Sequence, residues 1–194
     1  MKPIRPMLLL ALATTLGGCG GAALAPLASA ALQAAGLQKP AELPESHKPP
    51  RNVPLRLHAA NRLNVDARGQ PLALAVRLYK LRQKDAFEVA PYAAFLDPRL
   101  ERESLGADLV EVREIMLVPG QRYEVTEKVT REAGHVGIVA LFHKPASGRW
   151  RTAVSAADAE RDGLSVGLHA CAMSTGTGGI NGTAASALAS VRCQ

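Results

Sequence analysis

Hydrophobic residues recur at every second position along much of this chain, and this alternation limits the possible folds more than any other feature. Val53, Leu55 and Leu57 alternate with residues that are polar or that face away from them. A period of two is typical of a β-strand with one buried face. The same period returns in residues 72–81, so we expect two strands in the first part of a mainly β domain.

The second half of the chain is almost entirely strand-forming. Turn-like EAG, ASG and AERDG separate four alternating segments, which are RYEVTEKVT, HVGIVALFHKP, RWRTAVSA and GLSVGLHACA. In HVGIVALFH both faces are apolar, which is typical of a strand in the interior of a sandwich. We count about seven strands, and their short connections favour antiparallel pairing. The sequence therefore predicts an antiparallel β-sandwich, with a mainly aliphatic core because aromatic residues are only 4% of the chain.

A short helical excursion is expected between the second and third strands. Asp85 and Glu88 have the spacing of a capping box, and apolar residues recur after them at helical spacing. Pro91 should kink or split this helix. We expect a second helical turn in SLGADLVEV with Ser104 as its N-cap, before an extended segment that ends in a Pro-Gly turn.

The N-terminus has the features of an export signal. Lys2 and Arg5 precede an apolar stretch from residue 7 to 13, which is far shorter than the ~20 residues of a membrane-spanning helix. The following LGGC, which ends at Cys19, resembles a bacterial lipobox. In that motif the cysteine receives a diacylglycerol and an N-acyl chain and becomes the first mature residue. A plain secretory signal with an incidental cysteine is the alternative.

These features divide the chain into three parts. Residues 1–18 are expected to be a lipoprotein signal peptide, and residues 19–51 a lipid anchor with an Ala/Pro-rich linker. The linker begins with an alanine-rich run that could be helical and continues with prolines that favour an extended path. Residues 52–194 are expected to be the β-sandwich domain. By resemblance to Gram-negative lipoproteins, Gly20 directs the protein to the outer membrane, with the folded domain facing the periplasm.

The two remaining cysteines, Cys171 and Cys193, are predicted to form a disulfide because the periplasm is oxidising. The bridge would pin the glycine- and serine-rich C-terminal tail, which reads as a loose segment. Two free thiols are the alternative. The formal net charge is +6, but acidic residues are interleaved with the basic ones, so a nucleic-acid-binding stripe is not indicated.

No motif with the spacing of an enzyme or metal site stands out. Gly163–Gly167 matches G-x-S-x-G, yet no Asp or Glu follows Ser165 and the segment keeps the alternation of a strand, so a nucleophile elbow is not expected. The five histidines lack the spacing of metal ligands. Asn64 and Asp66 are two oxygen donors, whereas calcium takes six to eight. We therefore expect neither an enzyme nor a bound metal or soluble cofactor.

One connection is longer than its neighbours require. Residues 61–71, NRLNVDARGQP, join two strands that a two-residue hairpin could connect. Long ordered loops on a rigid sheet are frequent binding sites. An uninvolved flexible connection is the alternative.

At this loop the sequence resembles a known family. The similarity runs from about Asn52 to Ala172 and rests on several short motifs in order, which are NVDARGQP from Asn64 to Pro71, VRLYKL from residue 76, Phe87, Phe95-Leu96, LGADL from residue 105, Pro119-Gly120 and Trp150-Arg151. In this order they resemble the TssJ (VasD) lipoproteins of type VI secretion systems.

The resemblance implies a transthyretin-like β-sandwich and a non-enzymatic role. Proteins of this family sit at the periplasmic face of the outer membrane and bind the periplasmic C-terminal region of TssM, in a complex with TssL. Their contact loop lies between the first two strands. Here it corresponds to Asn61, Asn64, Asp66, Arg68, Gly69, Gln70 and Pro71. The resemblance implies neither a nucleic-acid partner nor a small-molecule substrate.

Two functions of other classes stay open at this point. A periplasmic sandwich lipoprotein could bind a small ligand or inhibit an envelope enzyme. A serine hydrolase would need Ser165 as its nucleophile, and its esterase activity would depend on that residue.

Overall fold

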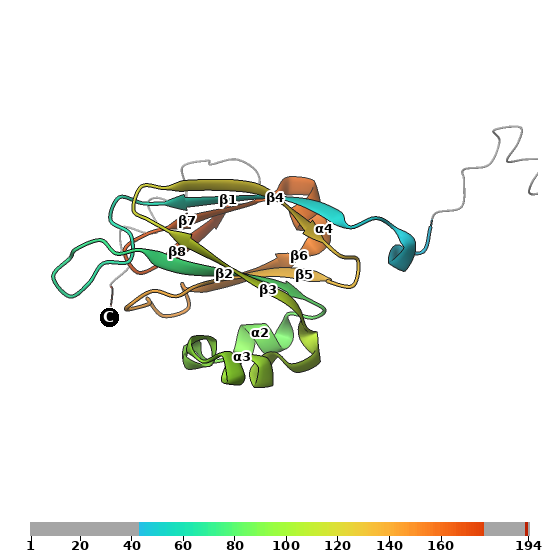
Figure 1. Ribbon diagram of the computed structural model, residues 1–194, viewed down its shortest axis with the longest axis horizontal. Helices are drawn as coiled ribbons and strands as arrows, with labels where there is room; N and C mark the ends of the chain where they lie inside the picture. The colour runs from blue at the N-terminus through green and yellow to red at the C-terminus, as the bar shows by residue number, and fades with distance from the viewer. Residues whose placement is uncertain (1–42, 177–192, 194) are drawn as a thin grey trace, which may run out of the picture. The chain divides into compact units, whose positions relative to one another are not determined.

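Two four-stranded sheets lie face to face in the computed structural model, which describes residues 43–176 and residue 193 (Figure 1). One sheet has the strand order β4-β1-β7-β8 and the other the order β3-β2-β5-β6. Their strands are β1 Arg51–Ala59, β2 Leu74–Leu81, β3 Leu109–Leu117, β4 Arg122–Val129, β5 His135–Ala140, β6 Arg151–Ser155, β7 Leu164–Leu168 and β8 Met173–Gly176. The predicted β-sandwich is confirmed. The lipobox at Cys19, the alanine-rich run and residues 177–192 of the tail lie outside the described residues.

The strand pairing differs from the prediction in two ways. The described residues form eight strands rather than about seven, because Met173–Gly176 pairs with β7 although the loose tail was predicted to begin at Ser174. Serine, threonine and glycine give this strand no hydrophobic alternation. In addition, β1 and β7 are parallel, with Leu55 opposite Leu164. The chain between them passes through the other sheet, so the rule that short connections give antiparallel neighbours does not apply to this pair.

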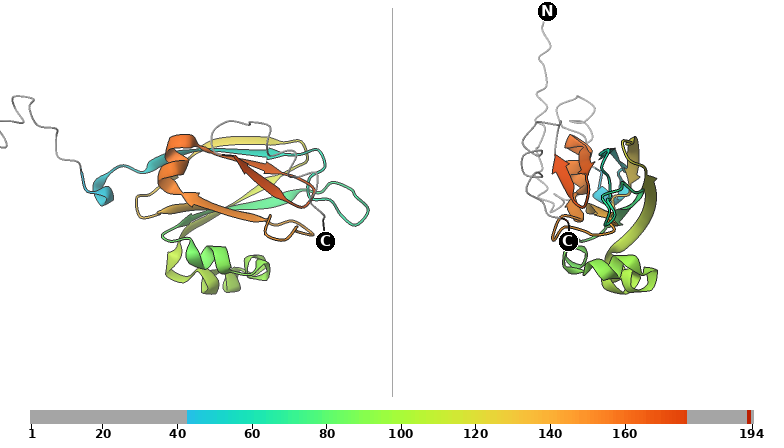
Figure 2. Two further views of the ribbon diagram at one scale, coloured as in Figure 1. Left: turned by 180° about the vertical axis from the view of Figure 1, so that it is seen from behind. Right: turned by 90° about the vertical axis from the view of Figure 1, so that its left-hand side faces the viewer.

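The alternating residues fill the space between the sheets. Val53, Leu55 and Leu57 of β1 are buried, and so are Leu74 and Val76 of β2. β5 pairs with β2 on one side and with β6 on the other, as its two apolar faces predict. Figure 2 shows the two layers from behind and from one end. The alternation thus fixes which face of each strand points inward.

The helical excursion covers the outer face of the β2 sheet (Figure 1). It consists of α2 Asp85–Val89, the 3₁₀ turn η2 Tyr92–Leu96, α3 Pro98–Leu105 and the 3₁₀ turn η3 Gly106–Asp108. Pro91 separates α2 from η2, as predicted. The predicted caps are wrong. Asp85 is the first helical residue after Lys84 and makes no side-chain cap bond. Ser104 lies in the last turn of α3, whose N-cap is Asp97.

Aromatic side chains gather where the excursion meets the sheet. Tyr79 of β2 lies 5.3 Å from Phe87 and 5.8 Å from Phe95, measured between ring centroids. Trp150 extends the cluster, 5.5 Å from Phe95. Gly137 of β5 makes room for it, because a Cβ atom there would lie 2.9 Å from Cζ of Phe87. The aliphatic interior of the sandwich and this aromatic layer are therefore on opposite faces of one sheet.

A buried carboxylate joins α3 to β2. Glu101 accepts hydrogen bonds from the hydroxyl of Tyr79 and from Arg77, whose Nη1 lies 3.0 Å from its Oε1. Arg77 also donates to the carbonyl oxygen of Phe95 at 2.9 Å and forms an ion pair with Glu114 of β3 at 2.9 Å. Burial, together with the Glu101 carboxylate, raises the pKa of Tyr79. The tyrosine therefore stays a neutral hydrogen-bond donor at physiological pH.

The remaining connections close the two ends of the sandwich. α4, Ala156–Asp162, crosses from β6 to β7 and is capped by Ser155, whose hydroxyl accepts from the Asp158 amide at 3.0 Å. Gly120 has a φ of 77° in the predicted Pro-Gly turn between β3 and β4. The predicted disulfide between Cys171 and Cys193 is present. Among the described residues no helix has the length and apolarity needed to cross a bilayer.

Candidate partner-binding loop

The connection between β1 and β2, residues 60–73, projects beyond one end of the sandwich (Figure 1). It crosses from one sheet to the other. Leu63 is fully buried at its base, and the Leu72 amide donates to the carbonyl oxygen of Leu63 at 3.0 Å. The loop is therefore closed at its base by packing and by a backbone hydrogen bond, and residues between these two positions form the tip.

Asn64 positions the loop and is not exposed on its surface. Its side chain is buried, and its φ of 46° lies in the left-handed region that asparagine adopts more readily than most residues. Nδ2 donates to the carbonyl oxygen of Ala73 at 2.7 Å, and Oδ1 accepts from the amide of His143 at 2.7 Å. One amide side chain thus joins both ends of this loop to the β5–β6 loop.

Asp66 shapes the tip. Its Oδ1 accepts from the amides of Arg68 at 2.8 Å and Gln70 at 2.9 Å. The Asp66 amide donates to the carbonyl oxygen of Gln70 at 2.9 Å, and Gly69 turns the chain with a φ of 76°. This is the local turn geometry that aspartate favours. The carboxylate is therefore largely used in holding the loop.

The other predicted residues face solvent. Arg68, Gln70 and Pro71 are exposed at the tip, and Asn61 is exposed at the start of the loop next to Gly120. A Cβ atom at Gly120 would lie 2.8 Å from Oδ1 of Asn61. The structure thus separates the predicted site into residues that shape the loop and residues that could contact a partner. That any of them does contact a partner stays a prediction.

Two segments beside the β1–β2 loop are not predicted from the sequence. The β5–β6 loop, residues 141–150, is held by Asn64, and the Asn64 and Val65 amides donate to the carbonyl oxygens of His169 and Ala170 at 3.1 and 3.0 Å. The β7–β8 turn, 169–172, also carries the disulfide of Cys171. No local sequence pattern predicts these contacts, because residues 64 and 65 lie far from residues 143, 169 and 170 in the sequence.

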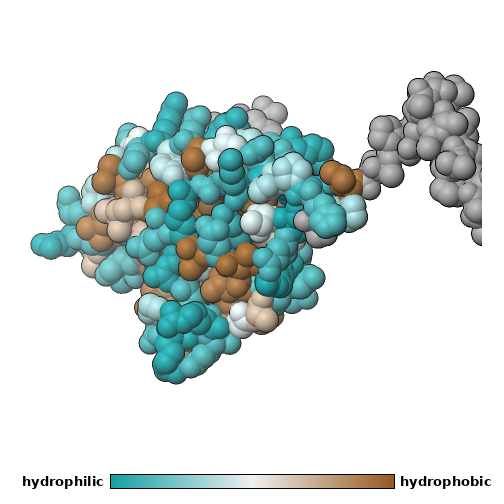
Figure 3. Space-filling model, turned by 45° about the vertical axis from the view of Figure 1, so that its right-hand side comes forward, coloured by the Kyte–Doolittle hydropathy of each residue, from teal (hydrophilic) through white to brown (hydrophobic). Residues whose placement is uncertain are grey.

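Apolar side chains are exposed at the same end. Met116 and Val118 lie where β3 leads into the β3–β4 turn, and Leu72 lies at the end of the β1–β2 loop. Figure 3 shows a mainly hydrophilic face with apolar areas toward this end and beside the helical excursion. Exposed methionine and aliphatic residues beside polar loops are common at protein–protein interfaces.

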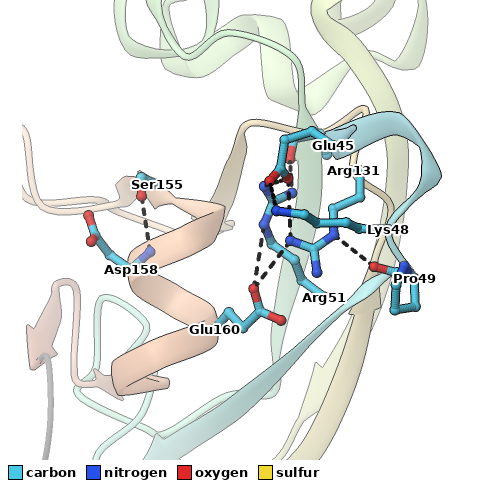
Figure 4. Close-up of polar contacts among 9 residues, drawn as sticks. Glu45, Lys48, Pro49, Arg51, Arg131, Ser155, Asp158 and Glu160 are labelled. Atoms are coloured by element: carbon cyan, nitrogen blue, oxygen red, sulfur yellow. Dashed lines mark hydrogen bonds and ion pairs between the residues drawn. The ribbon is translucent and has the colours of Figure 1, made fainter. Parts of the chain in front are cut away.

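The chain joins the sandwich at the opposite end, through a group of charged residues that we name the N-terminal clamp (Figure 4). Its members are Glu45, Lys48, Arg51, Arg131 and Glu160. Glu45 follows Pro44 in the 3₁₀ turn η1, Glu45–His47, and pairs with Lys48 at 2.6 Å. Oε2 of Glu160 on α4 lies 3.6 Å from both Arg51 and Arg131. The hydrogen bond to Lys48 lowers the pKa of Glu45.

The clamp holds residues that precede the first strand. Arg131 donates from Nε to the carbonyl oxygen of Pro49 at 2.7 Å and also lies 3.5 Å from Glu45. Residues 45–50, the end of the predicted linker, are thereby bound to the β4–β5 turn and to α4. β1 then runs from Arg51 to the β1–β2 loop. Its nine residues give it a length of about 30 Å.

The G-x-S-x-G segment is a strand, as predicted. Ser165 lies in β7 and pairs with Arg56 of β1. His169 is close to a different serine, with its Nε2 3.1 Å from Oγ of Ser174. Burial lowers the pKa of His169. The strand-to-helix turn of a nucleophile elbow is therefore not formed at Ser165.

The described part of the chain has two surface pockets away from the β1–β2 loop and no cluster of metal ligands. Within residues 43–176, no three His, Cys, Asp or Glu side chains converge as metal ligands. Surface pockets of about 350 Å³ beside α4 and about 290 Å³ between β6 and β8 are lined by residues outside the β1–β2 loop. Neither pocket shares a residue with the predicted site.

The fold and the loop together define a class of protein, a two-sheet sandwich with one helical excursion and one rigid projecting loop that presents polar side chains. A profile of the type VI secretion lipoproteins, the family of VasD, EvfM and TssJ, matches residues 51–171. The chain belongs to this family, whose members are structural lipoprotein components of the secretion system. A search of curated protein sequences gave no match.

Solved structures agree with this assignment. The lipoprotein TssJ1 of Pseudomonas aeruginosa is similar with a TM-score of 0.59 and 31% identity, over 69% of this chain and 100% of TssJ1. A chain in a structure of a type VI membrane complex gives 0.59 and 24%, covering 64% and 97%. A chain in a structure of the TssM C-terminal domain from EAEC gives 0.54 and 22%, covering 64% and 97%. The last two structures are less than 25% identical to this chain, and they support the fold alone.

Proposed function

We propose that this protein is an outer-membrane lipoprotein that anchors the type VI secretion membrane complex by binding the periplasmic C-terminal region of TssM. Membership of the lipoprotein family supports a place in that complex. The observation that best supports the proposed TssM-binding site is the rigid, projecting β1–β2 loop. Through TssM the protein would belong to one assembly with TssL.

The loop has the physical properties of a preformed binding element. The hydrogen bonds of Asn64 and Asp66 fix its backbone, so that little conformational entropy would be lost when a partner binds. The exposed side chains of Arg68 and Gln70 supply donors and an acceptor, and Pro71 stiffens the backbone. This arrangement fits recognition of a protein surface without a chemical reaction.

The position of the loop is consistent with a lipid anchor at Cys19. The N-terminal clamp receives the chain at one end of β1, and the loop leaves from the other end. A diacylglycerol and an N-acyl chain on Cys19 would hold the protein in the membrane, because two or more chains anchor stably where one does not. Gly20 supports the outer membrane as the destination. The lipid would position the protein, and the loop would hold TssM.

The test measures binding to the purified periplasmic region of TssM. Replacing Arg68 and Gln70 with alanine should weaken binding by about tenfold or more, because two exposed polar contacts at ~1 kcal/mol each would be lost. The matched control replaces Arg102 and Gln83, an exposed arginine and glutamine outside the loop end, and should bind like the wild type.

Three results would be informative. A wild-type protein that does not bind TssM contradicts the proposed function. Binding that survives the Arg68 and Gln70 replacements contradicts the assignment of the loop. An equal loss in the control variant also contradicts it, because the effect would then be unrelated to the loop.

A further inference from the structure

Arginine and lysine side chains that mostly lack a carboxylate partner gather at the loop end of the sandwich. We name this group the cationic surface and define it as Arg62, Arg68, Arg122, Lys144 and Arg149. All five are exposed, and Arg68 has 88% of its side chain accessible to solvent. Within residues 43–176 the side chains of four of them make no ion pair, and Arg68 makes one at 3.8 Å with Asp66.

The cationic surface differs from the rest of the described protein. Most other lysines and arginines there have a carboxylate within 4 Å, and this holds for Lys48, Arg51, Arg77, Lys80, Arg82, Lys84, Arg99, Arg113, Arg131 and Arg161. Arg56, Arg102, Lys128 and Arg151 also lack such a partner among the described residues. The first three lie singly on separate elements, and Arg151 donates to the carbonyl oxygens of Phe87 and Ala90 beneath the helical excursion. The concentration of unpaired charge is therefore a property of the loop end.

Few acidic groups are available to neutralise this surface. Asp66 is engaged by the amides of Arg68 and Gln70, and Glu124 lies two positions along β4 from Arg122. The C-terminal residues 177–194 contain no aspartate or glutamate, and residues 1–42 contain only Glu42. Like charges at one end of a domain repel one another and are stabilised when a partner supplies the opposite charge.

The backbone holds these charges in fixed relative positions. Asn64 joins the loop of Arg62 and Arg68 to the loop of Lys144 and Arg149. The Met173 amide donates to the carbonyl oxygen of Arg149 at 2.7 Å, and the Ala59 amide donates to that of Gln121, next to Arg122, at 2.9 Å. Four cations from two connected loops and a fifth from the start of β4 are therefore held at the same end of the sandwich.

We propose that the cationic surface binds an acidic surface of the periplasmic region of TssM and extends the interface from the β1–β2 loop to the β5–β6 loop. This inference rests on the proposed function, because it assigns the chemistry of the same partner. Exposed Leu72, Met116 and Val118 lie at this end and supply apolar contacts beside the charges. Arginine and methionine with apolar neighbours are the composition expected of a protein interface.

An acidic protein fits this surface better than an anionic membrane. The cations lie on two loops and at the start of β4, with exposed apolar residues at the same end, and this end of β1 is opposite to the N-terminal clamp. Complementary charge of this kind mainly accelerates association and selects the partner. The effect weakens with salt, because the Debye length falls from about 8 Å at physiological ionic strength to about 3 Å at 1 M.

The experiment measures association kinetics between the mature lipoprotein in non-ionic detergent and the immobilised periplasmic region of TssM. Lys144→Glu with Arg149→Glu changes the surface outside the β1–β2 loop, so that the loop contact is kept. Arg102→Glu with Lys128→Glu is the matched control, with the same change in charge at exposed sites elsewhere. Lys144→Gln with Arg149→Gln provides a milder variant should the reversal impair folding.

We expect the association rate of the reversed variant to fall by about tenfold at low salt, that of the glutamine variant to fall less, and that of the control to change by less than about twofold. These differences should disappear near 1 M salt. Equal rates for all variants, in a protein that still binds TssM, overturn this inference and leave the proposed function intact. A wild type that does not bind TssM overturns both.

A membrane partner would give a different result. The chain with Cys19→Ser, which lacks the lipid attachment site, should not sediment with phosphatidylglycerol vesicles. Sedimentation that is lost on reversal of Lys144 and Arg149 would overturn the protein partner and assign the cationic surface to the membrane.

Discussion

Asn64 links parts of the protein that are 79 positions apart in the sequence. It closes the β1–β2 loop on Ala73 and fixes the β5–β6 loop at His143, while its own backbone is left-handed. Both of its side-chain bonds are made in a buried environment, where an unmade hydrogen bond is expensive. The shape of the candidate site therefore depends on one residue that the partner need not touch.

Replacing Asn64 with alanine should lower the free energy of unfolding by about 2 to 4 kcal/mol, because a buried carbonyl and a buried amide lose their partners. Asn64→Gly loses the same bonds but accepts the positive φ, so its loss should be about 1 kcal/mol smaller. Chemical denaturation compares the two. Equal stability of the two variants would show that the backbone conformation of Asn64 carries no strain.

The sequence predicts the extent of this loop and its membership of a site, but it does not predict the role of each residue. The asparagine, aspartate and glycine between two alternating segments mark a turn-rich connection. The burial of Asn64 depends on backbone atoms of residues 73 and 143, and the cationic surface depends on Lys144 and Arg149. Such contacts arise only when the sandwich brings distant loops together.

At the scale of elements, the helical excursion is attached to its sheet by one buried ionic group. Glu101 of α3 meets Tyr79 and Arg77 of β2, and the aromatic cluster packs beside them. These three polar groups can be buried together because the Glu101 carboxylate accepts hydrogen bonds from the other two. The excursion therefore has a specific position on the sheet, which covers the outer face of β2 that would otherwise meet solvent.

Glu101→Ala should destabilise the excursion by about 3 kcal/mol or more, because Arg77 and Tyr79 would stay buried without their acceptor. Hydrogen exchange should rise in α3 before it rises in β1 or β7. The control is Glu103→Ala, which removes an exposed pair with Arg99 and should change stability by less than about 0.5 kcal/mol. Similar exchange in both variants would contradict the role of Glu101.

The elements were predicted as well as their sequence signals allow. β1, with strong alternation, and β5, with two apolar faces, are confirmed as strands, whereas β8 has one apolar residue, Met173, followed by small residues without alternation. The start of α3 was missed although Asp97 followed by Pro98 is a common helix beginning. The apolar residues after Ser104 favour it as a helix N-cap, but those residues continue into η3 and β3.

At the scale of the whole domain, β1 connects two ends with different tasks. The N-terminal clamp binds the incoming chain at one end, and the β1–β2 loop with the cationic surface lies at the other. β1 is also central in its sheet, paired with β4 on one side and β7 on the other. A force applied between an anchored N-terminus and a bound partner would therefore pass along a strand that is supported on both edges.

The clamp should release the preceding segment when its shared carboxylate is removed. In Glu160→Gln, Arg51 and Arg131 would keep only Glu45 as a common partner, and their mutual repulsion would be less well offset. We expect a small loss of stability, about 0.5 to 1 kcal/mol, and faster hydrogen exchange at the His47 and Lys48 amides. The control Asp158→Asn lies on the same helix outside the clamp and should leave both amides unchanged. Unchanged exchange in Glu160→Gln would mean that the packing of η1, and not the charges, holds the chain at this end.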